Sequence, residues 1–269
     1  LYGIDPAPHA PMVAMNSYGI GTISTGFLSD VVNNAVIDSY NLFCLSAVLE
    51  HLSAPGRQLK ELLKRVQNGT CIAVEVPDLE SFDAAHGEPL GELSLEHINY
   101  FSRSSLRNLF ASVGCVELCC QRVKHSSGGS LLALYRKENA LHSGVQVKDT
   151  ELMQNYVRIS TERLHSLLHK VVSKLHAPFI IYGAGSHTAR ILPMLSDASR
   201  QFPILAIVDN NPNLVGKQVD GIPIVSSAKL SDYPDMETLI SSFRYEKEIK
   251  NFLEKKGDVR KILTIYMDE

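Results

Sequence analysis

Short apolar runs alternate with amphipathic helical patterns over almost the whole chain, and this alternation constrains the fold more than any other feature. Residues 70–76 form a β-rich run that Pro77 stops. Ser102 is placed to cap a following helix, Gly114 to end it, and four apolar residues between them recur at helical spacing: Leu106, Leu109, Phe110 and Val113. Strands that alternate with helices predict an α/β fold built on mainly parallel sheets.

The same pattern divides the chain into three stretches. Residues 1–146 and 177–269 each predict an α/β domain, and residues 147–176 predict a connecting helix whose apolar residues share one face. In the first stretch we expect a helix capped by Ser53 and ended by Gly69, and strands at residues 40–45, 70–76, 116–122 and 130–135. The last two are so close that only an antiparallel hairpin at a sheet edge can join them. In the second domain we expect strands at residues 179–182, 204–208, 222–225, 236–241 and 262–266.

Composition excludes several classes of partner. The formal charge of −3 gives no electrostatic reason to expect nucleic acid or an anionic membrane surface. The five cysteines contain no C-x-x-C pair, which predicts reduced thiols, a cytoplasmic location and no metal ligands. No apolar run approaches the roughly 20 residues of a membrane span. We therefore expect a protein that acts on a small molecule; the oligomeric state is left open.

Polar side chains follow several predicted strands. Asp5 ends the opening strand, where an acidic residue can bind ribose hydroxyls. Glu50 and His51 follow the strand at residues 40–45, and Glu96 and His97 precede the helix that Ser102 caps. Because imidazole titrates near neutral pH, a histidine beside a carboxylate predicts acid–base chemistry, although either histidine can equally be structural.

A glycine-rich turn opens the second α/β domain. Gly183 and Gly185 follow a strand, and Asp209 ends the next strand at the distance expected of a ribose-binding acid. Thr188 stands where the dinucleotide fingerprint has its third glycine. The turn is therefore either a nucleotide site or a tight βα connection.

Taken in order, these segments resemble class I S-adenosylmethionine-dependent methyltransferases, and more narrowly the sugar C-methyltransferase family. Residues 2–5, Gly26-Phe27, residues 48–52 and residues 75–77 carry the general likeness. Glu96-His97 followed by Tyr100-Phe101-Ser102 is similar to the family's E-H-x-x-Y-F-S motif, and residues 127–130 are similar to its H-G-G-S turn. Residues 182–185, 209–212 and 221–224 resemble the Rossmann-like domain that follows catalysis in this family.

The resemblance implies a Rossmann-like methyltransferase sheet, truncated before its first strand and glycine loop, and then a smaller Rossmann-like domain. It implies S-adenosylmethionine as cofactor, held by Asp5, Gly26, Phe27 and Ser46. The substrate would be a nucleotide-linked keto sugar. His97 would be the base that removes a proton next to the ketone, and Glu96 and His51 would orient it or bind the keto sugar. Tyr100 would donate to the enolate oxygen.

The chain also departs from the family. Ser94-Leu95 replaces a Tyr-His pair, and Leu132 replaces an arginine. If the acceptor is instead a hydroxyl or an amine, His97 can act as base without an enolate. Two other functions stay open: a nucleotide-sugar or dinucleotide-binding module or oxidoreductase built on Gly183, Gly185 and Asp209, and a non-catalytic remnant.

Overall fold

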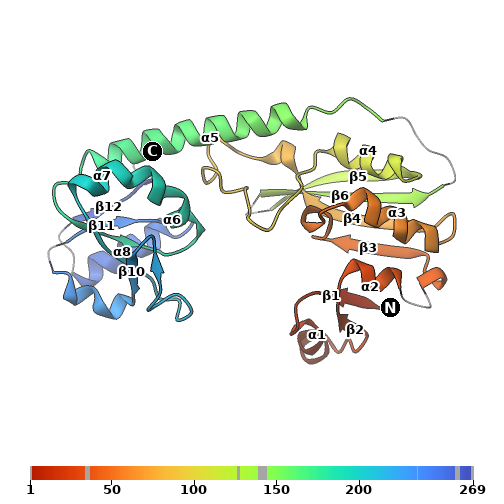
Figure 1. Ribbon diagram of the computed structural model, residues 1–269, viewed down its shortest axis with the longest axis horizontal. Coiled ribbons are helices and arrows are strands. Elements are labelled where there is room, and N and C mark those ends of the chain that lie inside the picture. Colours follow the sequence, from red (N-terminus) through yellow and green to blue (C-terminus); the bar gives the residue numbers. More distant parts are fainter. Residues whose placement is uncertain are drawn as a thin grey trace. The chain divides into compact units, whose positions relative to one another are not determined.

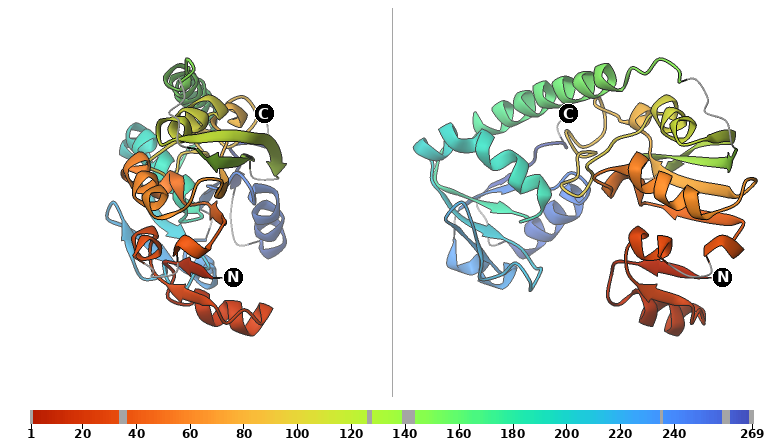
Figure 2. Two further views of the ribbon diagram at one scale, coloured as in Figure 1. Left: turned by 90° about the vertical axis from the view of Figure 1, so that its right-hand side faces the viewer. Right: turned by 45° about the vertical axis from the view of Figure 1, so that its right-hand side comes forward.

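The computed structural model describes residues 2–33, 37–125, 128–138, 144–234, 236–257 and 261–267. The chain forms two α/β units, shown in Figure 1 and, from two further sides, in Figure 2. The first unit comprises Leu1–Phe82 and Leu93–Asn155, and the second comprises Asp83–Glu92 and Tyr156–Glu269. Helix α5 (Asp149–Val172) contributes residues to both units. The predicted α/β fold class is confirmed.

The first unit contains two separate sheets. The smaller one pairs β1 (Gly3–Asp5) with β2 (Ile23–Thr25) in parallel, and the larger one has the strand order β3–β4–β6–β5. The strands of the larger sheet are β3 (Leu42–Ser46), β4 (Cys71–Pro77), β5 (Cys115–His125) and β6 (Gly128–Lys137). Only β3 and β4 are parallel; β6 runs antiparallel to both β4 and β5. The hairpin predicted at the sheet edge is thus confirmed, and it makes this sheet mixed rather than mainly parallel.

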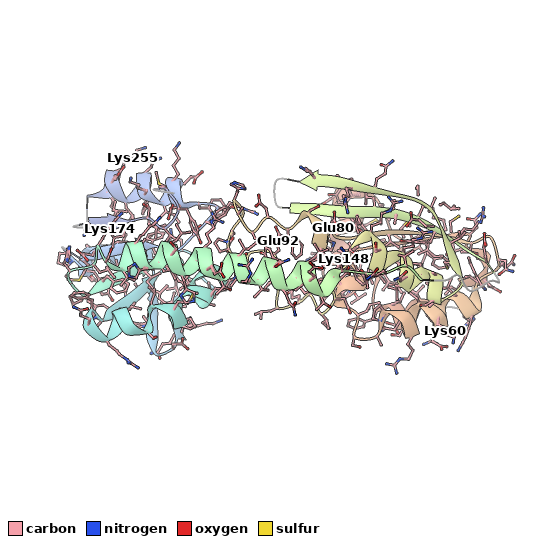
Figure 3. All side chains as sticks on the ribbon, turned by 90° about the horizontal axis from the view of Figure 1, so that it is seen from above. Lys60, Glu80, Glu92, Lys148, Lys174 and Lys255 are labelled. Atoms are coloured by element: carbon pink, nitrogen blue, oxygen red, sulfur yellow. The ribbon has the colours of Figure 1, made fainter. Side chains whose placement is uncertain are left out.

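Two helices cover one face of the larger sheet. Side chains alternate along β4, so that Ile72, Val74 and Val76 are buried, and the register places Leu45, Leu131, Ala133 and Tyr135 on the same face. This face packs against α3 (Pro55–Arg65) and α4 (Arg103–Ser112). Ser102 caps α4, as predicted. The N-cap of α3 is Ala54 rather than Ser53, so that Pro55 is its first residue; Lys60 of this helix is exposed (Figure 3).

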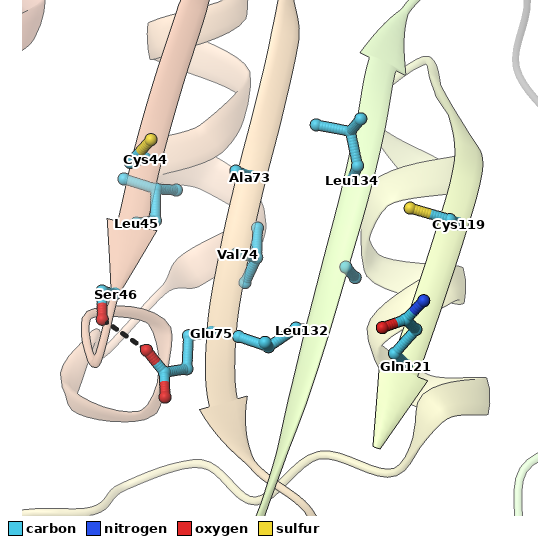
Figure 4. Close-up of a pocket in the computed structure, with 11 residues that line it drawn as sticks. Cys44, Leu45, Ser46, Ala73, Val74, Glu75, Cys119, Gln121, Leu132 and Leu134 are labelled. Carbon is cyan, nitrogen blue, oxygen red and sulfur yellow. Dashed lines mark hydrogen bonds between the residues drawn. The ribbon is translucent and has the colours of Figure 1, made fainter. Parts of the chain in front are cut away.

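The opposite face of this sheet is hollowed. A pocket of about 420 Å³ lies against it (Figure 4), lined by Cys44, Ser46, Ala73, Glu75, Gln121, Leu132 and Leu134 among others. Its lining is mostly apolar, and Leu132 keeps 41% of its surface exposed. Ser46 Oγ donates to Glu75 Oε2 at 2.7 Å where the two parallel strands end.

The second unit has a mostly parallel sheet of order β12–β11–β7–β8–β10–β9, in which only the edge strand β9 is antiparallel. Its strands are β7 (Phe179–Tyr182), β8 (Ile204–Val208), β9 (Gln218–Val219), β10 (Ile222–Val225), β11 (Glu237–Ile240) and β12 (Lys261–Leu263). All five predicted strands are confirmed, the last two shorter than expected. The helices are α6 (Ser186–Ile191), α7 (Ser196–Gln201) and α8 (Glu246–Lys256), with short 3₁₀ turns η4 (Leu192–Leu195) and η5 (Ser227–Asp232). Because the chain continues from β7 first to β8 and later to β11, the strand order reverses between β7 and β11.

Several short elements carry no sequence signal that we detected. They are α1 (Ala10–Tyr18), β2, α2 (Leu28–Val32), β9 and the 3₁₀ turns η1 (Ile37–Ser39), η2 (Leu49–His51) and η3 (Leu79–Ser81). Helix α1 buries none of its residues, so it has no apolar stripe by which periodicity finds a helix. None of the helices that the structure describes combines the length and apolar character of a membrane span.

Candidate active site

The candidate site begins where β3 ends. Ala47 has a φ of +52°, a left-handed conformation that is strained for a residue with a Cβ, and its N–H donates to the Glu75 carbonyl. This turn leads directly into η2, which carries Glu50 and His51. The strained backbone therefore sets the direction in which both side chains leave the carboxyl end of the sheet.

A distant loop is tied to this turn by its backbone. The N–H groups of Ile98 and Asn99 both donate to the Glu50 carbonyl, at 2.8 and 3.0 Å. The Asn99 side-chain amide donates to the carbonyls of Leu49 (3.2 Å) and Leu52 (2.6 Å). These four hydrogen bonds bring His97, which sequence analysis took as the base, beside the histidine that follows β3.

The two histidines form a close pair. Their ring centroids lie 5.0 Å apart at an interplanar angle of 69°. His51 Nδ1 lies 2.9 Å from the Glu96 carbonyl oxygen, and because a carbonyl only accepts, the proton of neutral His51 is on Nδ1. His51 Nε2 consequently carries the lone pair. The side chain of Glu96 is exposed, so it is the Glu96 carbonyl that orients His51.

Glu50 completes this cluster. Its side chain is 2% exposed, and Oε2 is buried without a hydrogen-bond partner among the described residues, as is Nδ1 of His97. One ligand atom of each of Glu50, His51 and His97 lies within 4.8 Å of the others. The sequence places Glu50 after the strand without indicating a role for it, because only the hydrogen bonds that join the two segments bring it to His97.

Tyr100 stands at the edge of the cluster. Its ring centroid lies 6.2 Å from that of His97 and 6.0 Å from that of Phe82, with edge-to-face geometry in both pairs. Its hydroxyl accepts a hydrogen bond from the Ser94 N–H at 3.3 Å. Tyr100 therefore packs against the candidate base and also helps to hold the loop that carries it.

Three of the residues predicted to bind the cofactor meet at the carboxyl ends of β1 and β2. The Gly26 N–H donates to the Asp5 carbonyl at 3.1 Å, and Phe27 follows with 67% of its surface exposed. The Asp5 carboxylate is exposed, with Oδ1 accepting from the Ala7 N–H. An exposed carboxylate beside an exposed aromatic ring fits a ribose and a purine base. Asp5, Gly26 and Phe27 thus fit the adenosine part of the cofactor. Ser46, the fourth predicted residue, bonds to Glu75 at the pocket of Figure 4.

The hairpin between β5 and β6 holds the turn that resembles H-G-G-S. Gly129 approaches Ser81 so closely that a Cβ on Gly129 would lie 2.6 Å from Ser81 Oγ. The Gly129 carbonyl accepts a hydrogen bond from the Asp78 N–H. Ser127, the first residue of that motif, lies outside the described residues. The glycine thus serves a close approach of two backbone segments.

In the second unit the glycine-rich turn has its own internal partners. Gly183 adopts a φ of +110°, and a Cβ there would lie 2.7 Å from the Ser241 carbonyl oxygen, so glycine is required by packing. Asp209 accepts from the Ala184 N–H through Oδ2 and from the Asn211 N–H through Oδ1. Thr188 is buried and donates to the Gly183 carbonyl. The residues that suggested nucleotide binding therefore hold the βα turn together.

A second histidine cluster lies in the same unit, where the strand order reverses. Buried His187 bonds through Nδ1 to Ser241 Oγ (2.8 Å) and through Nε2 to Tyr266 Oη (2.6 Å). Burial, assisted by the positive charge of Arg190, lowers the pKa of His187 to about 4. Burial also raises the pKa of Tyr266, which therefore keeps its proton at neutral pH. Both ring nitrogens of His187 are satisfied inside the protein.

Comparison with known families decides the identity of the first unit. Residues 1–119 match the family described as methyltransferase domain. This part of the chain is an S-adenosylmethionine-dependent methyltransferase domain. The predictions of a methyltransferase and of S-adenosylmethionine as its cofactor are confirmed. Residues 176–263, which follow the methyltransferase domain in the sequence, match a family described as C2185-like, N-terminal.

Solved structures similar to this methyltransferase include two from other methyltransferases. One is the complex of the Haloferax volcanii Trm112 methyltransferase activator with a putative methyltransferase: 13% identity, TM-score 0.41, covering 53% of this chain and 73% of that one. Another is a Thermotoga maritima S-adenosylmethionine-dependent methyltransferase, a possible histamine N-methyltransferase: 18% identity, TM-score 0.40, covering 51% of this chain and 73% of that one. A Rex-family repressor is also similar, at 17% identity and a TM-score of 0.29, covering 47% of this chain and 65% of that one. No curated protein matches the chain.

Proposed function

We propose that this methyltransferase adds a methyl group to the carbon next to the ketone of a nucleotide-linked sugar, with His97 as the base. The observation that carries the proposal is the cluster of Glu50, His51 and His97, in which two buried polar atoms have no partner among the described residues. Buried polar groups in proteins are nearly always satisfied, so two unsatisfied atoms in one cluster call for an explanation, and a ligand or a reaction supplies one. The cluster lies directly after β3, at the sheet edge where ligands of α/β folds bind.

The roles of the residues follow from their chemistry. Glu50, with its carboxylate close to His97, favours the form of His97 that carries a proton on the side facing the carboxylate, which leaves the other ring nitrogen free to accept the substrate proton. Tyr100, beside His97, would donate to the enolate oxygen, and Asp5, Gly26 and Phe27 would hold the adenosine of the cofactor. Bound S-adenosylmethionine supplies the sulfonium methyl group. The protein's own task is then to align the substrate and to stabilise the enolate.

The sugar acceptor is supported by the E-H-x-x-Y-F-S resemblance, because the residues of that motif serve one site. His97 and Tyr100 lie together, Phe101 is buried, and Ser102 caps α4 behind them. Ser94-Leu95 and Leu132 depart from the family at the acceptor side. A hydroxyl or an amine acceptor is therefore an outcome that the experiment must be able to reveal.

Proton exchange tests the proposal without requiring the complete reaction. The chain is incubated in D₂O with a nucleoside-diphosphate-linked keto hexose, and deuterium at the carbon next to the ketone is followed by NMR. We expect exchange, and we expect His97→Ala to slow it by roughly 10²- to 10⁴-fold, the usual contribution of a general base. His165→Ala removes an exposed histidine of α5 and is the matched control. Unchanged exchange in His97→Ala, or a methyl group found on oxygen or nitrogen of the product, would refute this role.

A further inference from the structure

We propose that Glu50, His51 and His97 together bind one divalent transition-metal ion of the zinc class. The inference rests on the same cluster as the proposed function but gives His97 a different role, and metal binding can be measured without any methyl transfer. Two imidazoles and one carboxylate form a ligand set that suits zinc, iron, cobalt and nickel. Catalytic sites of this composition leave further positions of the ion open to water or substrate.

The distances allow this set to close around an ion. One ligand atom of each residue lies within 4.8 Å of the other two. Ligand atoms about 2.0–2.1 Å from a tetrahedral zinc ion lie roughly 3.3 Å apart, so rotation of the side chains is enough to bring the three together. Among the residues that the structure describes, no other group of three potential ligands is this close.

Two features beyond the spacing point to a cation. Oε2 of Glu50 and Nδ1 of His97 are buried and have no donor or acceptor among the described residues. A carboxylate oxygen and an imidazole lone pair that lack a donor are both satisfied by one cation between them.

The tautomer of His51 is the other feature. His51 donates its Nδ1 proton to the Glu96 carbonyl and so presents a lone pair on Nε2. Metal-binding histidines usually donate their second N–H to a carbonyl or a carboxylate, which fixes the ring for coordination. Because His51 is also exposed, an ion and its water reach the cluster from solvent.

A bound ion would change the role of His97. An imidazole whose Nδ1 binds a cation carries its proton on Nε2 and accepts no other, so His97 cannot be ligand and base at once. In the metal-bound protein the ion would polarise the acceptor's ketone oxygen, and it would lower the pKa of a bound water so that the hydroxide left after this water loses a proton to solvent could accept the substrate proton. Metal binding and the base role of His97 therefore make different predictions for the same chain.

The test uses the full chain, stripped with a chelator and titrated with Zn²⁺ by calorimetry and with Co²⁺ by visible absorption. We expect one ion per chain and a cobalt spectrum of low coordination number. Glu50→Gln, His51→Ala and His97→Ala should each weaken binding by at least 10-fold. His165→Ala, which removes an exposed histidine of α5, should bind as the wild type does. Because Cys44 and Cys119 are exposed and attract zinc, a Cys44→Ser/Cys119→Ser variant must also bind normally.

The outcomes separate the two proposals. Absence of binding, or binding that the cysteine variant loses and the three cluster variants keep, overturns the metal site. If chelated protein then still exchanges the substrate proton, the base role of His97 stands alone. If the ion binds as expected but no keto sugar is exchanged or methylated, the metal site stands and the proposed acceptor fails. Should Glu50→Gln fail to fold, the exposed His51→Ala still decides the question.

Discussion

The two units each gather histidine and polar side chains at the carboxyl ends of their strands, yet the two clusters differ in how their polar atoms are satisfied. In the second unit both nitrogens of His187 have hydroxyl partners, Ser241 and Tyr266. In the first unit Oε2 of Glu50 and Nδ1 of His97 have none among the described residues. The two histidine clusters thus differ in how many of their buried polar atoms have partners among the described residues.

The difference extends to access and to charge. His187 is 6% exposed and its pKa is lowered to about 4, so it is neutral at physiological pH and reaches no solvent-borne substrate. His51 is exposed, and the hydrogen bond of its Nδ1 to the Glu96 carbonyl leaves the lone pair on Nε2. We conclude that the His187 cluster is satisfied by internal hydrogen bonds where the strand order reverses, whereas the Glu50 cluster keeps buried polar atoms without a partner among the described residues.

The largest effect that tests this comparison is expected in the second unit. His187→Ala removes two hydrogen bonds and leaves the hydroxyls of Ser241 and Tyr266 beside a cavity, which should lower the free energy of unfolding of this unit by about 2–4 kcal/mol. Hydrogen exchange of β7 and β11 peptides, followed by mass spectrometry, measures the loss in this unit alone. His165→Ala should leave that exchange unchanged. A loss below about 0.5 kcal/mol would mean that the hydrogen bonds of His187 do not stabilise the second unit.

The free energy of unfolding of the second unit should also depend on pH, through the titration of His187. The pKa of His187 is about 4 in the folded protein and 6.5 as its ordinary value, so the unfolded chain binds the proton more readily. Its contribution to stability is therefore complete above pH 6.5 and is lost as the pH falls from 6.5 to 4. A shift of this size corresponds to about 3 kcal/mol.

Comparison with a variant that cannot titrate isolates this contribution. His187→Gln should lose less stability than the wild type over the same pH range, since other groups titrate equally in both chains. Urea unfolding at pH 7, 5.5 and 4.5 measures the difference. Parallel curves for the two proteins would show that His187 is not held neutral by its surroundings.

Sequence patterns found the elements of the fold and the segments of the site, because strands and helices with one buried face repeat their apolar residues at fixed spacing. They found His97 and His51 because each stands beside the end of a periodic segment. They did not find the role of Glu50, since its meeting with His97 depends on the Asn99 amide and two backbone N–H groups that cross 47 to 50 residues. A hydrogen bond between distant loops leaves no periodic signal. Helix α1 was not predicted for a related reason: it buries no residue, so its sequence has no apolar face that repeats at helical spacing.

The smallest expected effect has the opposite sign and bears on the first unit. A buried carboxylate oxygen without a partner costs about 1–3 kcal/mol, and Glu50→Met keeps the length of the side chain while it removes the charge. We therefore expect Glu50→Met to raise the stability of β3 and β4 by about 1–2 kcal/mol in the presence of a chelator, measured by hydrogen exchange of their peptides. Replacement of His187 by methionine, where both ring nitrogens have hydrogen-bond partners, should instead destabilise the second unit.

Added metal should reverse the order of stability, so that the wild type becomes more stable than Glu50→Met. This reversal is the most direct test of the difference between the two clusters. At Zn²⁺ 100-fold above the dissociation constant, the wild type should gain about 2.7 kcal/mol by mass action and Glu50→Met much less. If Glu50→Met stays more stable than the wild type in the presence of metal, the unsatisfied carboxylate of Glu50 does not serve to bind the ion. A loss of stability in Glu50→Met with chelator present would show that the carboxylate is already satisfied in the folded protein. In that case the difference between the two clusters would lie in exposure alone, and the free lone pair of His51 would be the remaining reason to assign the first one a ligand.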